Sequence, residues 1–452
     1  MQYQSAIRYL FSFLNFECIP FQYQRQFNLK RMVFLLDWFG HPEHSFSSVL
    51  VAGTKGKGST ANFLASILIA NGYSTGLFSS PHLADPRERI RVNQRAISKN
   101  EFAGLVAKIR PIVERKKKKI TSVYGPITFF EIFTLLTILY FKTKRIDIGV
   151  FEVGLGGRLD ATNVLNPLVS VIAPISFDHE EHLGHTLRQI AGEKAAIIRN
   201  NGFVVSGRQV PEAKQVIQRQ IRKQKANAYF LGPSFQTLHE TVSQKGSRFD
   251  FKIASERWRN FQITLPGRFQ IDNAATALAT ASILENQFGL DLKEANIKKG
   301  LKTAFWPGRF EIVKRGPKTF VLDGAHNGAS MTEVCKAMET LFSGQRKVVI
   351  LGTSREKNLE AILKPLLHYN RKEELDYLIV TKSNNPRARE PKTILEALTK
   401  LDWKKPALWA QDIDKALQLV RRINLHKAVC LITGSLFLVA EAREALGCRK
   451  LI

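Results

Sequence analysis

The chain has 452 residues, of which 44% are hydrophobic, and its 67 Lys and Arg against 39 Asp and Glu give a formal net charge of +28. This length and apolar content exclude a disordered chain and allow two or three globular domains. The four cysteines are far apart and form no C-x-x-C pair, so they indicate neither a disulfide framework nor a zinc site, and they fit a reducing cytoplasm.

The start of the chain and its longest apolar run give no sign of export or membrane insertion. Residues 1–21 lack the basic region and the small-residue cleavage site of a secretory signal. The run at 129–141 contains Glu131 and is too short to span a bilayer, so it predicts a buried helix. The sequence therefore predicts a cytoplasmic protein with no membrane partner.

The first strand pattern leads into a glycine-rich loop, VAGTKGKGST. The apolar run 48–52 predicts a strand, and apolar residues at helical spacing predict a helix that Gly72 ends. In such a unit the backbone N–H groups and the helix N-terminus bind an anion, and Lys57 adds a positive charge for the outer phosphates. Only two residues separate Gly53 from the next Gly-Lys pair, whereas the common phosphate loop has four in this place. A loop that is two residues shorter than the common one disfavours an ordinary P-loop GTPase or motor protein.

Farther along the chain, short β-rich runs alternate with helical segments in two groups. The first group predicts a parallel sheet with functional groups at its carboxyl edge and comprises the runs 74–80, 146–154 and 168–176. The second group comprises the runs 319–328, 347–354, 376–383 and 428–435. Between them, a Trp-Pro-Gly sequence within 301–311 interrupts any regular element. The pattern predicts an α/β protein with two domains.

A series of motifs resembles one family along nearly the whole chain. In order they are VAGTKGKGST, FSSPHL followed by ERIRVN, TFFE, EVGLGGRLDATN, ISFDHEEHLG, IAGEKAAII, DNAATALA, PGRFE, LDGAHN and TGSLFLVAEA. Their order and spacing resemble folylpolyglutamate synthase and dihydrofolate synthase of the Mur ligase superfamily. The combination of the compressed loop, SSPHL and EVGLGGRLDATN is highly specific to that family.

The resemblance implies an ATP-dependent amide ligase. In that family, ATP phosphorylates a carboxylate of a folate or of dihydropteroate, and the amine of L-glutamate attacks the acyl phosphate to give an amide, ADP and phosphate. It implies an N-terminal P-loop-type ATPase domain with a parallel sheet at 1–303 and a smaller C-terminal Rossmann-like glutamate ligase domain at 304–452. A monomer without a nucleic-acid partner is expected.

The resemblance also assigns roles to individual residues. Lys57 and the backbone amides of residues 54–58 would hold the β- and γ-phosphates, because phosphoryl transfer depends on positive charge and positioning. The full set of expected ATP contacts is Thr54, Lys55, Gly56, Lys57, Gly58, Ser59, Asn273, Arg309 and Asp323. Because Arg309 lies on the linker and Asp323 beyond it, ATP is expected to be enclosed between the domains.

Magnesium, as two ions, is expected at Ser80, Glu152 and His179, which match the family's metal ligands. The assignment of Glu152 also agrees with physical chemistry, because a carboxylate that ends a buried apolar strand is costly unless it is paired or bound to metal. A lysine partner for Glu152 is the alternative. His179 is followed by His182, three residues on, whereas a zinc protease motif requires four, so the motif does not indicate zinc.

The expected catalytic residues are Lys57, Lys194 and His326. Lys194 matches a lysine that the family carbamylates, and a carbamate turns a cation into an anion with two acceptor oxygens. The alternative for Lys194 is a surface helix lysine paired with a carboxylate. His326 is expected near the incoming glutamate and the acyl phosphate. Thr128 and Asp160 match positions that contact dihydropteroate in bifunctional members.

Three points stay open at this stage. The loop TSREKN at 353–358 differs from the Asp-Lys-Asp-like element of the family, so Lys357 has no assigned role, and segment 24–40 matches the family's pteroate loop poorly. The chain is either a monofunctional folylpolyglutamate synthase or a bifunctional enzyme. A cell-wall Mur-type ligase and, because of the +28 charge, a nucleic-acid-binding ATPase are the alternatives, although the basic runs 115–119 and 219–225 are predicted to be solvated helix faces.

Overall fold

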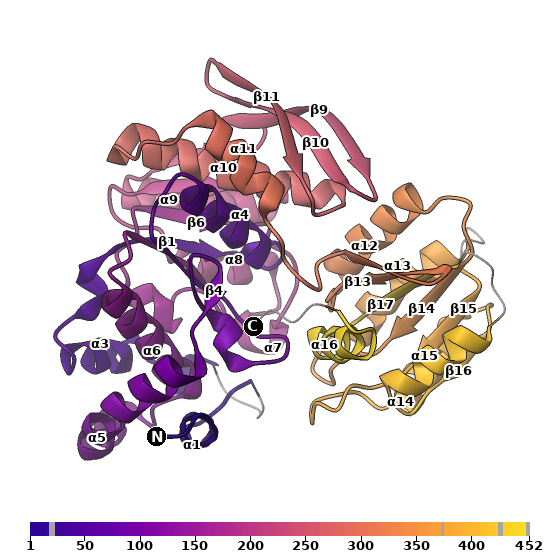
Figure 1. Ribbon diagram of the computed structural model, residues 1–452, viewed down its shortest axis with the longest axis horizontal. Coiled ribbons are helices and arrows are strands. Elements are labelled where there is room, and N and C mark those ends of the chain that lie inside the picture. The colour runs from indigo at the N-terminus through magenta and orange to yellow at the C-terminus, as the bar shows by residue number, and fades with distance from the viewer. Residues whose placement is uncertain (18–22, 372–374, 424–427, 449–452) are drawn as a thin grey trace.

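The computed structural model describes residues 1–17, 23–371, 375–423 and 428–448. Two α/β halves lie side by side along the long axis, the N-terminal half on the left in Figure 1 and the C-terminal half on the right. This arrangement confirms the predicted two-domain α/β class. Among the described residues, no helix combines the length and apolar character that crossing a bilayer requires.

The N-terminal half is built on one eight-stranded sheet with the strand order β4-β3-β2-β5-β1-β6-β7-β8. The six strands from β2 to β8 in that order are parallel, and β3 and β4 form an antiparallel edge. The strands are β1 (Ser47–Ala52), β2 (Thr75–Phe78), β3 (Ile90–Val92), β4 (Arg95–Ala96), β5 (Ile148–Glu152), β6 (Val169–Ile172), β7 (Phe203–Ser206) and β8 (Asn227–Phe230). The predicted strands around residues 50, 76, 150 and 170 are confirmed as β1, β2, β5 and β6.

Helices cover both faces of this sheet. They are α1 (Tyr3–Phe11), α2 (Tyr23–Gln26), α3 (Leu29–Asp37), α4 (Lys57–Ala70), α5 (Lys99–Tyr124), α6 (Phe129–Lys144), α7 (Glu180–Leu183), α8 (Leu187–Ala195), α9 (Pro211–Gln224), α10 (Arg268–Phe288) and α11 (Glu294–Thr303), with the 3-10 turns η1 (Pro42–Ser45), η2 (Pro86–Arg89) and η3 (Ala161–Val164). Alternate residues of β1 enter different cores, because side chains along a strand point to opposite faces: Leu50 packs in one and Val51 in the other.

The apolar run at 129–141 forms the buried helix α6, as predicted. Its one acidic residue, Glu131, is buried and receives a hydrogen bond from Arg31 Nε at 2.9 Å. Glu131 also closes a capping box with Thr128, the residue before the helix. The carboxylate is therefore neutralised by a buried partner and stabilises the helix start.

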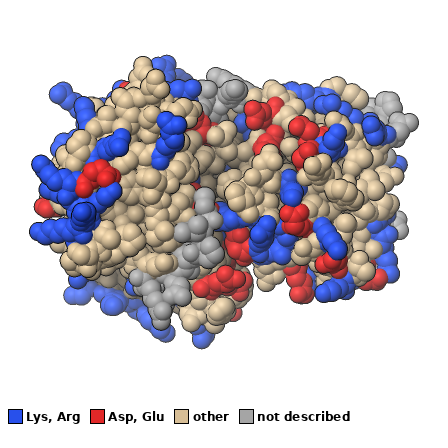
Figure 2. Space-filling model, turned by 90° about the horizontal axis from the view of Figure 1, so that it is seen from below, with Lys and Arg blue, Asp and Glu red and all other residues tan. Residues whose placement is uncertain are grey.

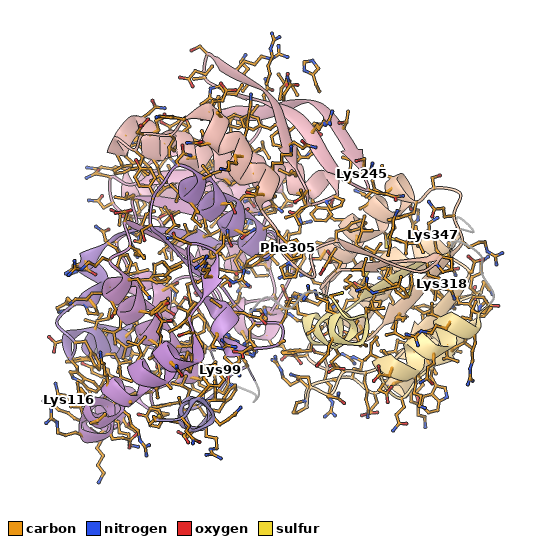
Figure 3. The ribbon with its side chains drawn as sticks, in the orientation of Figure 1. Lys99, Lys116, Lys245, Phe305, Lys318 and Lys347 are labelled. Carbon is orange, nitrogen blue, oxygen red and sulfur yellow. The ribbon has the colours of Figure 1, made fainter. Side chains whose placement is uncertain are left out.

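A three-stranded antiparallel sheet that the sequence did not predict follows β8. It consists of β9 (Phe235–Ser243), β10 (Gly246–Ile253) and β11 (Glu256–Ile263) and lies at the top of the N-terminal half in Figure 1. Its β9–β10 hairpin reaches the C-terminal half: Lys245 is labelled beside it in Figure 3, and Gln244 Nε2 donates a hydrogen bond to the carbonyl of Leu341 at 2.9 Å.

The C-terminal half contains a six-stranded sheet in the order β12-β13-β17-β14-β15-β16, parallel except for β12. Its elements are β12 (Glu311–Arg315), β13 (Lys318–Leu322), β14 (Lys347–Leu351), β15 (Tyr377–Val380), β16 (Ala407–Trp409), β17 (Val429–Thr433), α12 (Gly328–Leu341), α13 (Leu359–Arg371), α14 (Pro391–Lys400), α15 (Ile413–Arg422) and α16 (Leu436–Ala445). Residues 304–310 join the halves, and Phe305 in this linker lies between them in Figure 3.

Basic side chains are spread over the face seen in Figure 2, and acidic ones interrupt them. The basic runs at 115–119 and 219–225 lie on the helices α5 and α9, and their charged residues are exposed or half-buried. These runs are solvated helix faces, as predicted.

Candidate active site

A single cavity of about 930 Å³ receives side chains from both halves of the molecule. All of the predicted site residues line it: Thr54, Lys55, Gly56, Lys57, Gly58, Ser59, Ser80, Thr128, Glu152, Asp160, His179, Lys194, Asn273, Arg309, Asp323 and His326. The carboxyl ends of the parallel strands β1, β5 and β6 bring the N-terminal residues together, as expected for ligand sites in such sheets.

The glycine loop between β1 and α4 is held tightly against its neighbours. Gly56 has a φ of +82°, and a Cβ at this position would lie 2.3 Å from Asn273 Oδ1, so both the backbone conformation and the space require glycine. The amides of Thr54 and Lys55 donate hydrogen bonds to the carbonyl of Pro174 at 3.0 and 3.2 Å. These two amides therefore already have an acceptor. Of the residues 54–58 that were expected to donate to phosphate, only those at the start of α4 still have amides without a hydrogen-bond acceptor among the described residues.

The start of α4 provides the free donors. The first-turn amides of a helix, here residues 57–59, have no acceptor within the helix and carry the positive end of its dipole. The ammonium group of Lys57 lies 3.5 Å from the carbonyl of Thr54, a long contact that leaves most of its hydrogen-bonding capacity available. The Lys55 ammonium group instead lies 3.8 Å from Glu333 of α12, across the domain interface.

Glu152 ends β5 and is only 4% exposed. Among the described residues its carboxylate accepts one hydrogen bond, from the amide of Ser80 at 3.2 Å. Burial raises the pKa of Glu152, and the positive charges of Lys57 and Arg309 oppose that rise. The alternative of a direct lysine partner is not seen, so a buried carboxylate with spare acceptor capacity faces the cavity beside the loop.

Lys194, on α8, is buried, so the alternative of a surface lysine is wrong. Its Nζ donates a hydrogen bond to the carbonyl of Gly53 at 2.9 Å. Burial, together with the positive charge of Lys57, lowers the pKa of Lys194 to about 7, against the opposing effect of nearby carboxylates. Near neutral pH a large share of this side chain is therefore the uncharged amine, which is the form that reacts with electrophiles.

The buried carboxylate of Asp323 holds the backbone at the end of the linker through hydrogen bonds. Asp323, which follows β13, accepts hydrogen bonds from the amides of Phe310 and Ala325, both at 2.8 Å. The guanidinium group of Arg309 makes no hydrogen bond or ion pair with the described residues and faces the cavity. Arg309 is thus a cation available for an anionic ligand between the domains.

Asp178, which the sequence did not single out, joins the two halves of the molecule. Its Oδ1 accepts a hydrogen bond from Lys357 Nζ at 2.6 Å, and its Oδ2 accepts one from Asn327 Nδ2 at 3.1 Å. Burial alone would raise the pKa of Asp178, but the neighbouring side chains of His179 and Lys357 hold it well below its usual value. The position of Asp178 in the sequence could have indicated a role. It lies in the loop after a parallel strand, and such loops are found at the carboxyl edge of the sheet, where ligands bind.

Two histidines lie around this carboxylate. His326 Nδ1 is 2.8 Å from the carbonyl of Gly324 and therefore carries the proton, and its Nε2 lies 3.5 Å from Asp178 Oδ2. His179 Nε2 lies 3.3 Å from Lys357 Nζ, a spacing at which the neutral imidazole accepts a hydrogen bond from the ammonium group. The sequence assigned no role to Lys357. In the structure it is the cation of the C-terminal half that contacts both Asp178 and His179 of the N-terminal half.

Thr128 and Asp160 line the cavity but use their side chains within their own loops. The two carboxylate oxygens of Asp160 accept hydrogen bonds from Gly154, Leu155 and Thr162. Thr128 caps α6. Both residues thus stabilise the local backbone that lines the site, and contact of either with a substrate stays a prediction.

Replacing Lys357 by Met is expected to lower turnover by about tenfold or more, because removing one partner of a buried ion pair leaves the other charge uncompensated. Steady-state kinetics of Lys357→Met, Asp178→Asn and the double variant measure the effect, and we expect a coupling energy above about 1 kcal/mol. Lys364→Met is the matched control, since Lys364 is an exposed, ion-paired lysine of the same domain. Additive effects of the two substitutions would mean that the contact does not hold the halves together.

A short glycine loop of the phosphate-binding type that faces a second α/β domain across one cavity is the arrangement of a two-domain nucleotide-dependent enzyme. Two domain families match the chain accordingly: the Mur ligase middle domain over residues 51–281 and the Mur ligase glutamate ligase domain over residues 308–436. The chain belongs to the folylpolyglutamate synthase and dihydrofolate synthase family of Mur ligases, and it is an ATP-dependent acid–amino-acid ligase.

Three similar proteins match this chain over almost the full length of both chains. The dihydrofolate synthase/folylpolyglutamate synthase of Bacillus subtilis is 34% identical over 98% of this chain and 99% of its own. The structure of Mycobacterium tuberculosis folylpolyglutamate synthase complexed with ADP is 27% identical, with a TM-score of 0.90 over 99% of this chain and 98% of that one. A structure described as an FPGS-AMPPCP-folate complex is 28% identical, with a TM-score of 0.82 over 99% and 100% of the two chains.

Proposed function

We propose that this enzyme joins L-glutamate to a carboxylate of a folate, with conversion of ATP to ADP and phosphate through an acyl phosphate. The observation that carries this proposal is the single cavity in which the phosphate loop of one domain faces Arg309, Asp323 and His326 of the other. Relatives described as bound to ADP, AMPPCP and folate support it. A monomer that acts without a nucleic-acid partner is part of the proposal.

In the proposed first step, the folate carboxylate attacks the γ-phosphorus of ATP, and ADP leaves. Lys57 and the first-turn amides of α4 hold the transferring phosphoryl group, where positive charge stabilises the transition state. Arg309, unpaired in the described structure, binds phosphate oxygens from the opposite side. Asn273, on α10, lies so close to the loop that a Cβ at Gly56 would come within 2.3 Å of its Oδ1, which places its amide group beside the proposed phosphate site.

In the second step, the amine of L-glutamate attacks the acyl carbon, phosphate leaves, and the ammonium group must first lose a proton. His326 lines the cavity and, because its Nδ1 is engaged by the carbonyl of Gly324, can use its Nε2 for this purpose. Asp178 lies 3.5 Å from that nitrogen and stabilises a protonated ring. We therefore assign His326 as the group that receives or orients the proton, and Lys357 as the residue that positions Asp178.

The donor set beside the loop fits magnesium in part. Glu152 is a hard oxygen ligand with spare acceptor capacity, and Ser80 provides an adjacent hydroxyl oxygen, both of which suit Mg²⁺. His179 fits less well, because Lys357 occupies its Nε2. Bound magnesium supplies charge neutralisation between the phosphates and the attacking carboxylate. A carbamate on Lys194 would add an anion near the same place, and the lowered pKa of its amine supports that modification.

The acceptor end of the cavity is aromatic. Phe16, Phe27 and Phe130 line it, and Phe16 stacks on Phe27 with ring centroids 5.2 Å apart. Phe129, the neighbour of Phe130 in the sequence, is instead buried between other rings of α6 and α1. Flat faces of this kind suit the pterin ring that folates and dihydropteroate share. Use of dihydropteroate as a second acceptor is thus part of the proposal.

The test is the release of ADP by the purified chain with ATP, magnesium and labelled glutamate. We expect release to require both glutamate and an acceptor, and a comparison of tetrahydrofolate with dihydropteroate separates a monofunctional from a bifunctional enzyme. A UDP-linked muramoyl acceptor and single-stranded RNA are the controls and should give no stimulation. Turnover with the muramoyl acceptor alone, or ADP release that follows added RNA, would refute the proposal.

A further inference from the structure

Two histidines and a glutamate gather at the end of the sheet that lies opposite the active site. His41, Glu43 and His44 belong to the connection between α3 and β1, around the 3-10 turn η1. The six residues of β1 separate this connection from the phosphate loop, a distance of roughly 20 Å at about 3.3 Å per residue. The cluster therefore plays no part in the ligase chemistry described above.

The donor atoms of these three side chains converge. His41 Nδ1 lies 2.9 Å and His44 Nε2 3.7 Å from the same oxygen, Oε1 of Glu43, and all the donor atoms lie within 4.8 Å of one another. Ligands at about 2.0–2.1 Å around a tetrahedral zinc ion lie about 3.4 Å apart, so the observed separations bracket that value. Among the described residues, this is the group of His, Cys, Asp or Glu whose donors meet in this way.

The carboxylate of Glu43 is buried without full hydrogen bonding, which is energetically unfavourable. Its side chain is only 7% exposed, and its second oxygen, Oε2, is buried without a hydrogen-bond partner among the described residues. A buried carboxylate with an unsatisfied oxygen is unfavourable, and a cation bound at Oε1 lowers that cost because it neutralises the charge of the carboxylate. His41, moreover, has a φ of +49°, a left-handed conformation that is uncommon for a residue other than glycine.

A second carboxylate lies near the first histidine. His41 Nε2 lies 3.8 Å from Oδ1 of Asp37, at the end of α3, on the side of the ring away from Glu43. Metal-binding histidines commonly direct their second nitrogen to such an outer carboxylate, which fixes the ring and its tautomer. The rings of His41 and His44 also lie nearly parallel, 13° apart, with centroids separated by 5.4 Å.

We propose that His41 Nδ1, Glu43 and His44 Nε2 bind one divalent transition-metal ion of the zinc class, with a fourth position open to water. Imidazole ligands favour Zn²⁺, Ni²⁺ or Co²⁺ over Mg²⁺, so the site is distinct in chemistry from the magnesium site of the ligase reaction. The ion joins the α3–β1 connection into a closed loop beneath the sheet. It stabilises this connection and leaves the active site unchanged.

The experiment is a titration of the full chain with Zn²⁺ alone, after removal of metals with a chelator and without ATP. Calorimetry should show that the unmodified chain binds one equivalent of zinc. In His44→Ala the affinity for this zinc should fall by at least about tenfold or binding should be lost, since even outer-shell changes cost 10- to 100-fold in metal affinity. Glu43→Gln should behave in the same way. His44 is 74% exposed, so its alanine variant should fold and keep full ligase activity.

Two matched variants locate the ion. His368→Ala removes another exposed histidine, on α13, and should bind zinc as the unmodified chain does. His179→Ala removes the imidazole of the active-site cavity and should retain the equivalent that His44→Ala loses. Equal binding by His44→Ala and the unmodified chain, or loss of the zinc in His179→Ala alone, would overturn the proposal. Absence of any zinc binding by the unmodified chain would overturn it as well.

Discussion

The Lys57→Ala variant is expected to lose turnover by at least about a hundredfold, the scale of a lost transition-state stabiliser. Lys57 begins α4, and its ammonium group has one long contact, 3.5 Å to the carbonyl of Thr54, so it is available to a phosphoryl group. The α4 amides remain in the variant and still bind the nucleotide. We therefore expect the loss to appear mainly in kcat, with a smaller change in nucleotide affinity.

The measurement is single-turnover ADP formation together with direct nucleotide binding. Lys55→Ala is the matched control, because Lys55 lies in the same loop but directs its ammonium group toward Glu333 at 3.8 Å. Its removal should reduce turnover by less than about tenfold, the range of a half-exposed ion pair with a contribution of up to about 1 kcal/mol. Near-normal turnover in Lys57→Ala would mean that the glycine loop is not the ATP site.

The Lys194→Ala variant is expected to be nearly inactive yet folded if the lysine acts as a carbamate. Alanine is the most favourable residue in a helix, and Lys194 lies in the last turn of α8. The space left by the buried side chain beside Gly53 can accept a short carboxylic acid. Acetate or propionate should therefore restore part of the activity, because it supplies the missing anion.

The pKa of Lys194 gives this prediction a pH dependence. CO₂ reacts with the neutral amine and forms a carbamate with loss of one proton. Because burial lowers the pKa to about 7, the neutral share rises as the pH increases from 6 to 8, and carbamylation should rise with it. Added bicarbonate should support the unmodified chain alone, since the alanine variant has no amine. Native mass measurement should find one added CO₂ on the unmodified chain and none on the variant.

The opposite outcome has a clear pattern. If Lys194 acts as a cation, small alkylamines should rescue Lys194→Ala and acetate should fail. A bare amine in the native mass spectrum, together with rescue by amines, would lead us to withdraw the carbamate and assign Lys194 a cationic or structural role.

Much of the fold was predicted from the sequence, because strand and helix signals are local, whereas the candidate site residues were assigned through the motifs that resemble the family. The apolar run before Gly53 and the helical spacing after it define β1 and α4, and the run at 129–141 defines α6. The sheet β9–β11 was missed. Its strands alternate irregularly, with register shifts on both sides of β10, and they expose many polar residues, so the short periodic signal is weak.

The contacts that shape the site were decided by the tertiary structure. Asp178 and Lys357 are 179 residues apart and meet only because the linker places the C-terminal sheet opposite the N-terminal one. Likewise, nothing in the loop sequence shows that Pro174 takes the amides of Thr54 and Lys55, or that Lys194 is buried against Gly53. Motif and periodicity determine which residues stand at the edge of each sheet, since strand and helix patterns are set by near neighbours. Hydrogen-bond partners, burial and pKa values depend on segments that are distant in the sequence and close in space. They are therefore determined only by the packing of the folded domains.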